Sequence, residues 1–275
     1  MESLSVEQRF KNIEYNLDFI RDRINNAAVV SGRKPEDIKL MAVTKTVEPI
    51  FINHAIEYGI DLIGENKVQE FLGKKEHLKL SGCDAHLIGH LQTNKVRQIV
   101  GEVSMIQSVD SVKLAKEISK RSLAAGCTTD CLIEINIGNE ESKSGLDYSE
   151  FNETLCQIAE LPAICVKGMM TIPPFDCSET QLNKYFSKMH ELFIDIKAKK
   201  LDNVDICVLS MGMSSDYEIA IKNGSIPISI SLPIVDAESF VCRVLNTKCP
   251  VIADLIAICA VSSSRISPIM ITFGS

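Results

Sequence analysis

Tryptophan is absent from the 275-residue chain, and aromatic residues make up only 5% of it. The first residues, Met1-Glu2-Ser3-Leu4-Ser5, lack the basic and apolar stretches of a secretory signal, and no apolar run approaches the length of a membrane span. The net charge of -7 disfavours non-specific attraction to nucleic acid or to anionic lipid. We therefore expect a cytoplasmic protein that binds neither nucleic acid nor membranes.

A Cys-x-x-Cys pair is also lacking, although the chain contains 10 cysteines. The closest two, Cys127 and Cys131, are not followed by a histidine at a zinc-site spacing. The other cysteines are scattered through predicted strands and helices. We therefore expect reduced, small apolar residues rather than disulfides, and no metal site.

Helical and strand patterns alternate along the chain. Apolar residues recur at helical spacing from Ser5 to Gly32, with Ser5 and Gln8 in a capping-box pattern and Gly32 as the stop signal. Further helices are predicted over residues 49–58, 178–199 and 216–223. Seven short apolar strands are predicted over residues 40–45, 62–66, 85–90, 105–109, 131–137, 165–171 and 206–210.

Short buried strands separated by helices predict an α/β fold with a parallel sheet. A dinucleotide-binding glycine fingerprint is absent, and polar residues close nearly every predicted strand, so a TIM-type (β/α)8 barrel with a leading helix is favoured over a doubly wound sheet. Barrel strands end at one face, where these side chains are expected to converge. They are Thr44, Lys45, Glu65, Asn66, His90, Ser108, Asp110, Asn136, Thr171 and Ser210.

Lys45 ends the first predicted strand and is the leading candidate for chemistry. A lysine carried inward on an apolar strand tends to lose its proton, and its free amine can form an imine with an aldehyde such as that of pyridoxal phosphate. The alternative is a solvated surface lysine at a strand end.

The segment from Ser210 to Asp216 follows the seventh predicted strand, where barrels commonly hold phosphate. Gly212 lets the backbone approach an anion, and the hydroxyls of Ser214 and Ser215 are donors beside the start of the next helix. The alternative is an ordinary capping box made by Ser215 and Glu218.

Six separated motifs within residues 40–224 resemble the pyridoxal phosphate homeostasis proteins, the YggS/PROSC family of alanine-racemase-like barrels. They are Ala42-Val43-Thr44-Lys45, Ile63-Gly64-Glu65-Asn66-Lys67-Val68-Gln69-Glu70, His86-Leu87-Ile88-Gly89-His90-Leu91-Gln92-Thr93-Asn94-Lys95, Ser108-Val109-Asp110, Gly168-Met169-Met170-Thr171-Ile172 and Leu209-Ser210-Met211-Gly212-Met213-Ser214-Ser215-Asp216.

This resemblance implies a protein of intracellular pyridoxal 5'-phosphate homeostasis that holds the cofactor as a Schiff base on Lys45, without robust turnover. Asn66 and His90 then lie beside the ring and the entrance, and Met170 packs on the cofactor. The resemblance places the phosphate group of the cofactor beside Ser210, Gly212, Met213, Ser214 and Ser215. Apo pyridoxal-phosphate enzymes are candidate partners, and a monomer is expected.

Several of these residues have plainer interpretations. Asn66 could cap the helix that begins near Lys67, and His90 could be a satisfied core histidine. Glu65 is expected to stabilise its strand end rather than to act as an acid or base. Met169 and Met170 could be core packing alone.

The chain departs from the family after Ser225, where relatives run into a last strand of the form valine-arginine-isoleucine-glycine, whose arginine faces the pyridine nitrogen. Here residues 226–235 alternate in apolar character and could form the eighth strand, although Pro227 and Pro233 argue against a central position. We expect a cofactor-binding barrel over residues 1–235 and an atypical tail over 236–275. A motif similar to the missing strand, with altered spacing, begins at Arg265 and is a candidate counterpart. The apolar run 251–261 could cover an open edge of the barrel sheet.

Three functions therefore compete: a cofactor-homeostasis protein, a racemase-like enzyme, and a family member with impaired cofactor binding. By the resemblance, a racemase needs a second base, a tyrosine from an additional β domain. None of the five tyrosines lies in the tail, so the enzyme is the weaker hypothesis.

Overall fold

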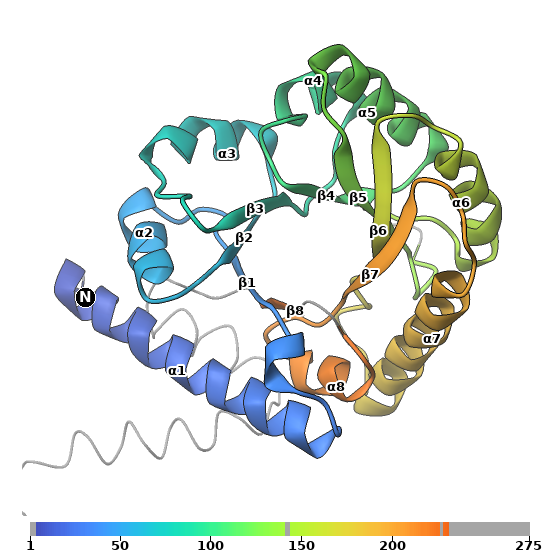
Figure 1. The fold of residues 1–275 in the computed structure, drawn as a ribbon. Helices are drawn as coiled ribbons and strands as arrows, with labels where there is room; N and C mark the ends of the chain where they lie inside the picture. The colour runs from blue at the N-terminus through green and yellow to red at the C-terminus, as the bar shows by residue number, and fades with distance from the viewer. Residues whose placement is uncertain (1–3, 141–143, 226–227, 231–275) are drawn as a thin grey trace, which may run out of the picture. The chain divides into compact units, whose positions relative to one another are not determined.

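Eight parallel strands form one curled sheet in the order β7-β6-β5-β4-β3-β2-β1-β8 (Figure 1). The structure, a computed structural model, describes residues 4–140, 144–225 and 228–230. This arrangement confirms the predicted barrel-type α/β fold. The strands are β1 (Leu40–Val43), β2 (Leu62–Glu65), β3 (Asp84–Leu87), β4 (Met105–Val109), β5 (Thr129–Glu134), β6 (Ile164–Met170), β7 (Val204–Ser210) and β8 (Ile228–Ile230).

Helices surround the sheet on its outer side (Figure 1). They are α1 (Val6–Val30), α2 (Pro49–Glu57), α3 (Val68–Lys74), α4 (Val96–Ile99), α5 (Val112–Ala125), α6 (Phe151–Ala159), α7 (Glu179–Lys197) and α8 (Tyr217–Lys222). Short 3-10 turns span Pro35–Asp37, Lys75–His77, Thr93–Lys95 and Tyr148–Glu150. Every helix predicted from the pattern is present, with ends shifted by one or two residues.

The leading helix α1 buries one apolar stripe, which includes Ile13, Leu17, Ile20 and Ile24. The Ser5 hydroxyl caps it by accepting from the backbone N–H of Gln8, but the Gln8 side chain donates to Asn12 instead of completing the capping box. The capping box of α7 is complete, with Ser178 and Gln181 bonded reciprocally.

Arg23 of α1 binds Glu218 of α8 at 2.5 Å, which ties the first helix to the last one described. Glu218 is therefore not part of a capping box with Ser215, and the residue that precedes α8 is Asp216, whose side chain makes no capping bond. The plainer interpretation of the loop after β7 is thus wrong, because Glu218 is engaged across the helix pair.

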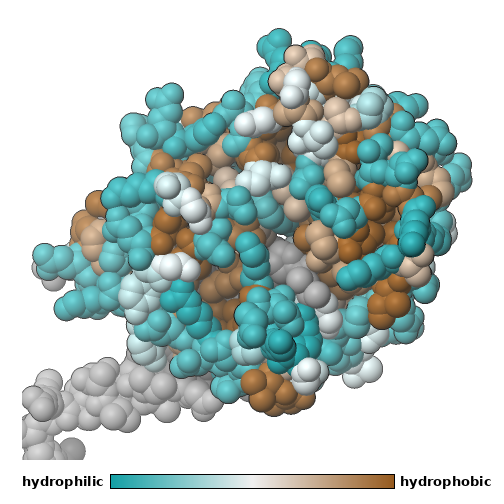
Figure 2. Space-filling model, viewed as in Figure 1, coloured by the Kyte–Doolittle hydropathy of each residue, from teal (hydrophilic) through white to brown (hydrophobic). Residues whose placement is uncertain are grey.

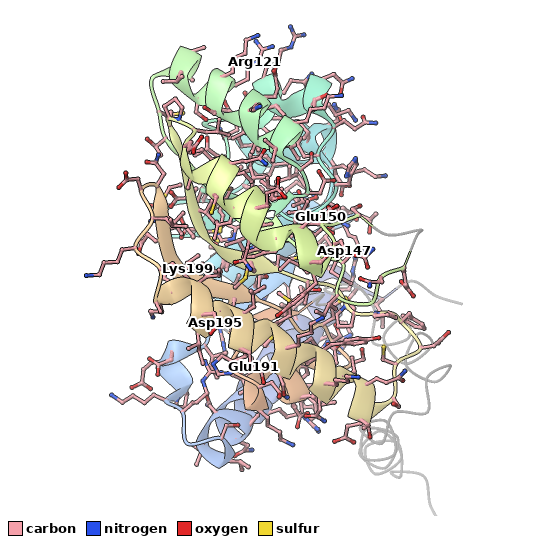
Figure 3. The ribbon with its side chains drawn as sticks, turned by 90° about the vertical axis from the view of Figure 1, so that its right-hand side faces the viewer. Arg121, Asp147, Glu150, Glu191, Asp195 and Lys199 are labelled. Atoms are coloured by element: carbon pink, nitrogen blue, oxygen red, sulfur yellow. The ribbon has the colours of Figure 1, made fainter. Side chains whose placement is uncertain are left out.

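The core lies between the sheet and these helices. Strands β2 and β4 are buried along their whole length, as parallel strands covered on both faces should be. Hydrophilic residues cover most of the periphery in Figure 2, with hydrophobic residues between them nearer the centre of this face. Figure 3 shows charged side chains on the outer helices, such as Glu191 and Asp195 of α7.

Strand ends differ from the prediction at the functional edge. β1 ends at Val43, β2 at Glu65 and β3 at Leu87, so Lys45, Asn66 and His90 lie in the loops that follow rather than on the strands. At β1 the cause is a tight turn, since Val47 N–H donates to the Thr44 carbonyl at 3.1 Å. Thr46, inside this turn, has a φ of 60°.

Strand β8 pairs in parallel with β1, with Leu40 opposite Ile228 and Ala42 opposite Ile230. An eighth strand within residues 226–235 therefore forms, and its place at the end of the strand order suits the flanking prolines. The chain divides into units 1–234 and 235–275. The tail, Arg265 and the run 251–261 lie outside the described residues.

Within the described part of the chain, no helix is long and apolar enough to cross a membrane. Seven cysteines fall in this part and none forms a disulfide. Cys83 and Cys131 are buried, whereas Cys156 and Cys207 are exposed.

Truncation after Ser225 should destabilise the protein, and truncation after Ile234 should not, because only the first removes β8 and bares the edge of β1. Two or three lost ladder hydrogen bonds are worth about 2 kcal/mol, or roughly 4–8 °C in melting temperature. Thermal melting followed by circular dichroism measures this. Equal melting temperatures for the two truncations would show that β8 does not complete the barrel.

Candidate functional site

A pocket of about 360 Å³ opens where the carboxyl ends of the strands meet. Its wall combines strand-end residues with loop residues that follow them. They are Val43, Lys45, Asn66, Ile88, Gly89, His90, Gln107, Glu134, Ile135, Ser144, Met170, Thr171, Ile172, Ser210, Met211, Gly212 and Met213.

Seven of the nine predicted cofactor residues line this pocket: Lys45, Asn66, His90, Met170, Ser210, Gly212 and Met213. Ser214 and Ser215 follow in the same loop, half-buried and exposed respectively, and are not part of the wall. Residues far apart in sequence are thus gathered at one edge, as convergence of barrel strand ends requires.

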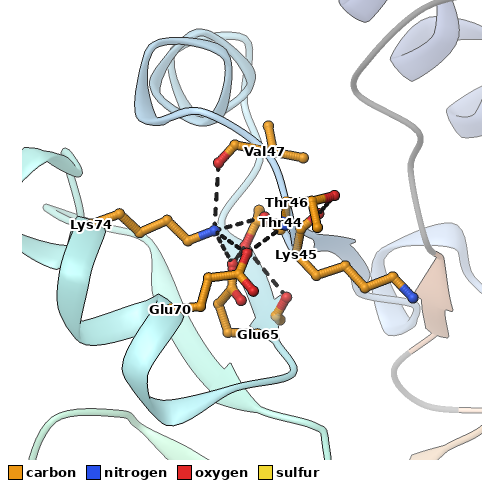
Figure 4. A network of polar contacts seen from close by, with 8 residues as sticks. Thr44, Lys45, Thr46, Val47, Glu65, Glu70 and Lys74 are labelled. Atoms are coloured by element: carbon orange, nitrogen blue, oxygen red, sulfur yellow. Dashed lines mark hydrogen bonds and ion pairs between the residues drawn. The ribbon is translucent and has the colours of Figure 1, made fainter.

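Lys45 is exposed, so the expectation of an amine buried on an apolar strand is wrong. The strand ends two residues earlier, and the turn at Thr44–Val47 sets Lys45 at the margin of the pocket. Figure 4 shows its side chain leaving this turn on the side away from Lys74. The amine is therefore accessible from solvent and from the pocket.

Asn66 has a buried Oδ1 that accepts no hydrogen bond from the described residues. Its predicted alternative role as a helix cap is wrong, because α3 is preceded by Lys67 and has no side-chain cap bond. A buried amide oxygen without a donor is costly unless a ligand or water supplies one. The backbones at Asn66 and Gly89 approach each other closely, since a Cβ on Gly89 would lie 2.3 Å from the Asn66 carbonyl oxygen.

His90 lies at the rim, with its side chain 55% exposed, and its Nδ1 is 3.2 Å from Asp110. It is not the core histidine of the alternative interpretation. The buried histidine is His86 on β3, whose Nδ1 pairs with the Gln107 side-chain amide at 2.7 Å. Burial lowers the pKa of His86 to about 4, so its ring is neutral at physiological pH.

Gln107 also accepts from the Ser210 hydroxyl at 2.7 Å, which links β3, β4 and β7 inside the sheet. Sequence reasoning missed Gln107 and His86. The available signal was a polar residue in the middle of an otherwise apolar strand, which a buried partner must satisfy.

Glu134 is a third residue that sequence reasoning missed. It lies at the end of β5, two residues after Leu132, so both side chains point to the same face of the sheet. Leu132 packs with Met105 and Met170 in a buried cluster, and Glu134 lies in the pocket wall. Burial, with a smaller effect from nearby Asp110, raises the pKa of Glu134 to about 7.

The loop after β7 is held by its own backbone. Gly212 has a φ of 95°, a conformation that favours glycine, and the Met213 N–H donates to the buried carboxylate of Asp216. Burial raises the pKa of Asp216 to about 6, although hydrogen bonds from the backbone N–H groups of Met213 and Asp216 act to lower it. Ser225 closes the loop by donating to the Met211 carbonyl at 2.8 Å.

The two methionines of β6 have different surroundings. Met169 is fully buried, in keeping with the core-packing interpretation, whereas Met170 belongs both to the cluster with Leu132 and to the pocket wall. Glu65 is buried and accepts from Thr44 at 2.6 Å, which fits its expected role at the strand end. Among the described residues, no group of three or more histidine, cysteine or acidic side chains could hold a metal ion.

Residues 15–225 match the family model of the alanine racemase N-terminal domain. A pyridoxal phosphate homeostasis protein of Aquifex aeolicus is 41% identical over 209 residues, which cover 76% of this chain and 91% of that protein. The protein of the same name from Escherichia coli K12 is 35% identical, over 83% of this chain and 98% of its own length.

Solved structures agree with these matches. A protein of unknown function from Bifidobacterium adolescentis has a TM-score of 0.80 at 34% identity, covering 85% of this chain and 98% of its own. PipY of Synechococcus elongatus, solved with pyridoxal phosphate bound, has a TM-score of 0.68 at 26% identity, covering 79% and 100%. The fold is therefore that of the alanine racemase N-terminal domain. Within it, the chain belongs to the pyridoxal phosphate homeostasis protein family.

The raised pKa of Glu134 predicts that the folded protein loses stability as pH rises from about 4.5 to about 7, because the folded state binds the proton more tightly than the unfolded chain. Glu134→Gln should remove this loss and stabilise the protein at pH 8 by about 3 kcal/mol. Urea unfolding at pH 5 and pH 8 measures it.

His86 and Asp216 titrate in both proteins, so their effects cancel in the comparison. The exposed Glu150→Gln is the matched control and should behave as the wild type. If Glu134→Gln kept the wild-type pH dependence, Glu134 would not be the buried acid.

Proposed function

We propose that this protein binds pyridoxal 5'-phosphate covalently through Lys45 and serves intracellular pyridoxal phosphate homeostasis. The observation that carries the proposal is one pocket wall that holds both an accessible lysine and the glycine-containing loop after β7. Its support from relatives is the family membership and the cofactor bound in PipY, a structure that the chain covers completely.

Bound pyridoxal phosphate supplies an aldehyde that a lysine amine can attack with loss of water. Lys45 is the lysine in the described pocket wall, and its side chain makes no hydrogen bond or ion pair within the described residues. An amine that is not engaged elsewhere can reach a ligand without breaking a contact. Proximity to a ligand held in the pocket then supplies the reactivity of this amine.

The rest of the wall suits a flat, polar ring with an anionic arm. Met170 offers an apolar contact, and the unsatisfied Oδ1 of Asn66 can accept from a donor on the ligand. Gly212, without a side chain, lets an anion approach the backbone beside the Ser210 hydroxyl. Ser214 and Ser215 complete this loop and are the proposed outer contacts of the phosphate.

We assign no catalytic residue. None of the five tyrosines lies in the pocket wall, and a racemase needs a base on each face of the cofactor. Alanine racemase of Clostridium difficile shares the fold at 14% identity, and the chain covers only 59% of that enzyme. The relatives that match over nearly their full length are homeostasis proteins.

The proposal extends to a barrel over residues 1–235 with an atypical tail, to a monomer in the cytoplasm, and to apo pyridoxal-phosphate enzymes as recipients of the cofactor. Reduced cysteines support the location, since the seven described ones form no disulfide. A carrier must release its ligand, and a rim open at His90 and Ile172 leaves room for that release.

Purified protein incubated with pyridoxal phosphate should develop a visible absorption band, and borohydride should fix the cofactor onto Lys45. Lys45→Ala should lose the band, and Lys67→Ala, an exposed lysine after β2, is the control that should keep it. Peptide mass spectrometry locates the adduct. An adduct elsewhere, or none, would remove the proposed function and favour a family member with impaired binding.

Pyridoxal without its phosphate should bind at least about tenfold more weakly than pyridoxal phosphate, because the loop after β7 then has no anion to hold. Titration of the absorption band with each compound gives both dissociation constants. Equal affinities would contradict the assignment of residues 210–215 to the phosphate.

A further inference from the structure

A buried lysine lies behind the reactive one. Lys74, at the end of α3, has a side chain that is only 9% exposed, and its Nζ lies 2.5 Å from Glu65 and 3.1 Å from Glu70. The same ammonium donates to the Thr44 carbonyl at 2.8 Å and reaches the Val47 carbonyl at 3.5 Å. Figure 4 shows these contacts converging on the turn that carries Lys45.

Glu70 holds the other side of this turn. Its carboxylate accepts from the backbone N–H of Thr46, the residue directly after Lys45. Burial works against the charge on Glu70, but the Thr46 amide and Lys74 outweigh it, so the pKa of Glu70 lies below its ordinary value. Glu70 is therefore ionised at neutral pH and acts as a charged acceptor, the stronger kind.

The turn needs such support because Thr46 has a φ of 60°. A β-branched residue is strained in this region, and such strain persists only where surrounding contacts hold it. The residue before Lys45 is fixed as well, since the Thr44 hydroxyl donates to Glu65 at 2.6 Å and its N–H donates to Gly64.

We propose that Lys74, Glu65 and Glu70 form a positioning network that fixes the backbone on both sides of Lys45 and so aims its amine at the ligand pocket. None of the three residues lines the pocket, so they are positioning residues rather than binding residues. This inference rests on the proposed function of Lys45. The network explains why the exposed side chain of Lys45, which makes no hydrogen bond or ion pair within the described residues, can still point in one direction.

Glu70 is the position at which to test the network. Removing Lys74 would leave the buried charge of Glu65 unpaired and could unfold the protein, whereas Glu70 is partly exposed. Glu70→Ala should slow fixation of pyridoxal phosphate on Lys45 by about tenfold to a hundredfold, the scale on which misplaced reactive groups lose rate. Glu70→Gln keeps an oxygen acceptor for Thr46 and should stay within about threefold of the wild type.

A rescue separates positioning from general stability. Thr46→Gly relieves the strain at φ 60°, because glycine adopts this conformation freely, so Glu70→Ala/Thr46→Gly should recover most of the lost rate. Glu76→Ala, an exposed glutamate in the next turn, is the matched control and should leave the rate unchanged.

A second measurement needs no cofactor. Amide hydrogen exchange of Thr46 in ligand-free protein should accelerate at least about tenfold in Glu70→Ala, because its acceptor is gone. Unchanged exchange, an unchanged rate of fixation, or loss without rescue by Thr46→Gly would each overturn the network. If the wild type forms no adduct while Glu70→Ala still accelerates exchange, the failure lies in the proposed function and not in the network.

Discussion

The turn from Thr44 to Val47 is the constraint on which the site depends, because it carries the chain from a buried strand to the margin of the pocket within four residues. Two lysines meet at this turn with opposite roles. Lys74 is enclosed by two carboxylates and two carbonyl groups, so its ammonium is paired inside the protein. Lys45 points the other way and remains available (Figure 4). A buried ion pair is by itself weak evidence for stability, so the role of Lys74 follows from the backbone contacts that it makes.

Inside the sheet, apolar side chains come first along the strands and polar side chains follow them. Met105, Leu132 and Met170 form an apolar cluster, and polar side chains follow it on the same strands toward the carboxyl ends. On β4 the change is from Met105 to Gln107, and on β5 from Leu132 to Glu134. The β5–β6 ladder is regular from Leu132 to Glu134, so these two side chains share a face, and Gln107 is placed by its position in the pocket wall. The apolar cluster therefore precedes Gln107 and Glu134 along the strands, and these two polar residues belong to the pocket wall.

Local periodicity and cap signals predicted α1, α2, α7, α8 and seven of the parallel strands, whereas no bounds were predicted for α4, α5 and α6. The strand ends were harder, since the exposure of Lys45 follows from a turn that long-range contacts with Lys74 and Glu70 hold in a strained conformation. Gln107 and Glu134 were missed for a related reason. The β4–β5 ladder shifts register between Ile106 and Val109, and the β5–β6 ladder after Cys131, so facing residues cannot be assigned from sequence alternation alone.

Backbone pairing of the last strand and recognition of a ring are separate physical requirements. β8 pairs with β1 through backbone hydrogen bonds, which any residue except proline can supply, and its three residues lie between Pro227 and Pro233. An arginine that faces a pyridine nitrogen acts instead through its side chain. A chain can therefore lose that arginine and keep the strand, in which case the fold and the lysine turn persist while affinity for the ring is the property that falls.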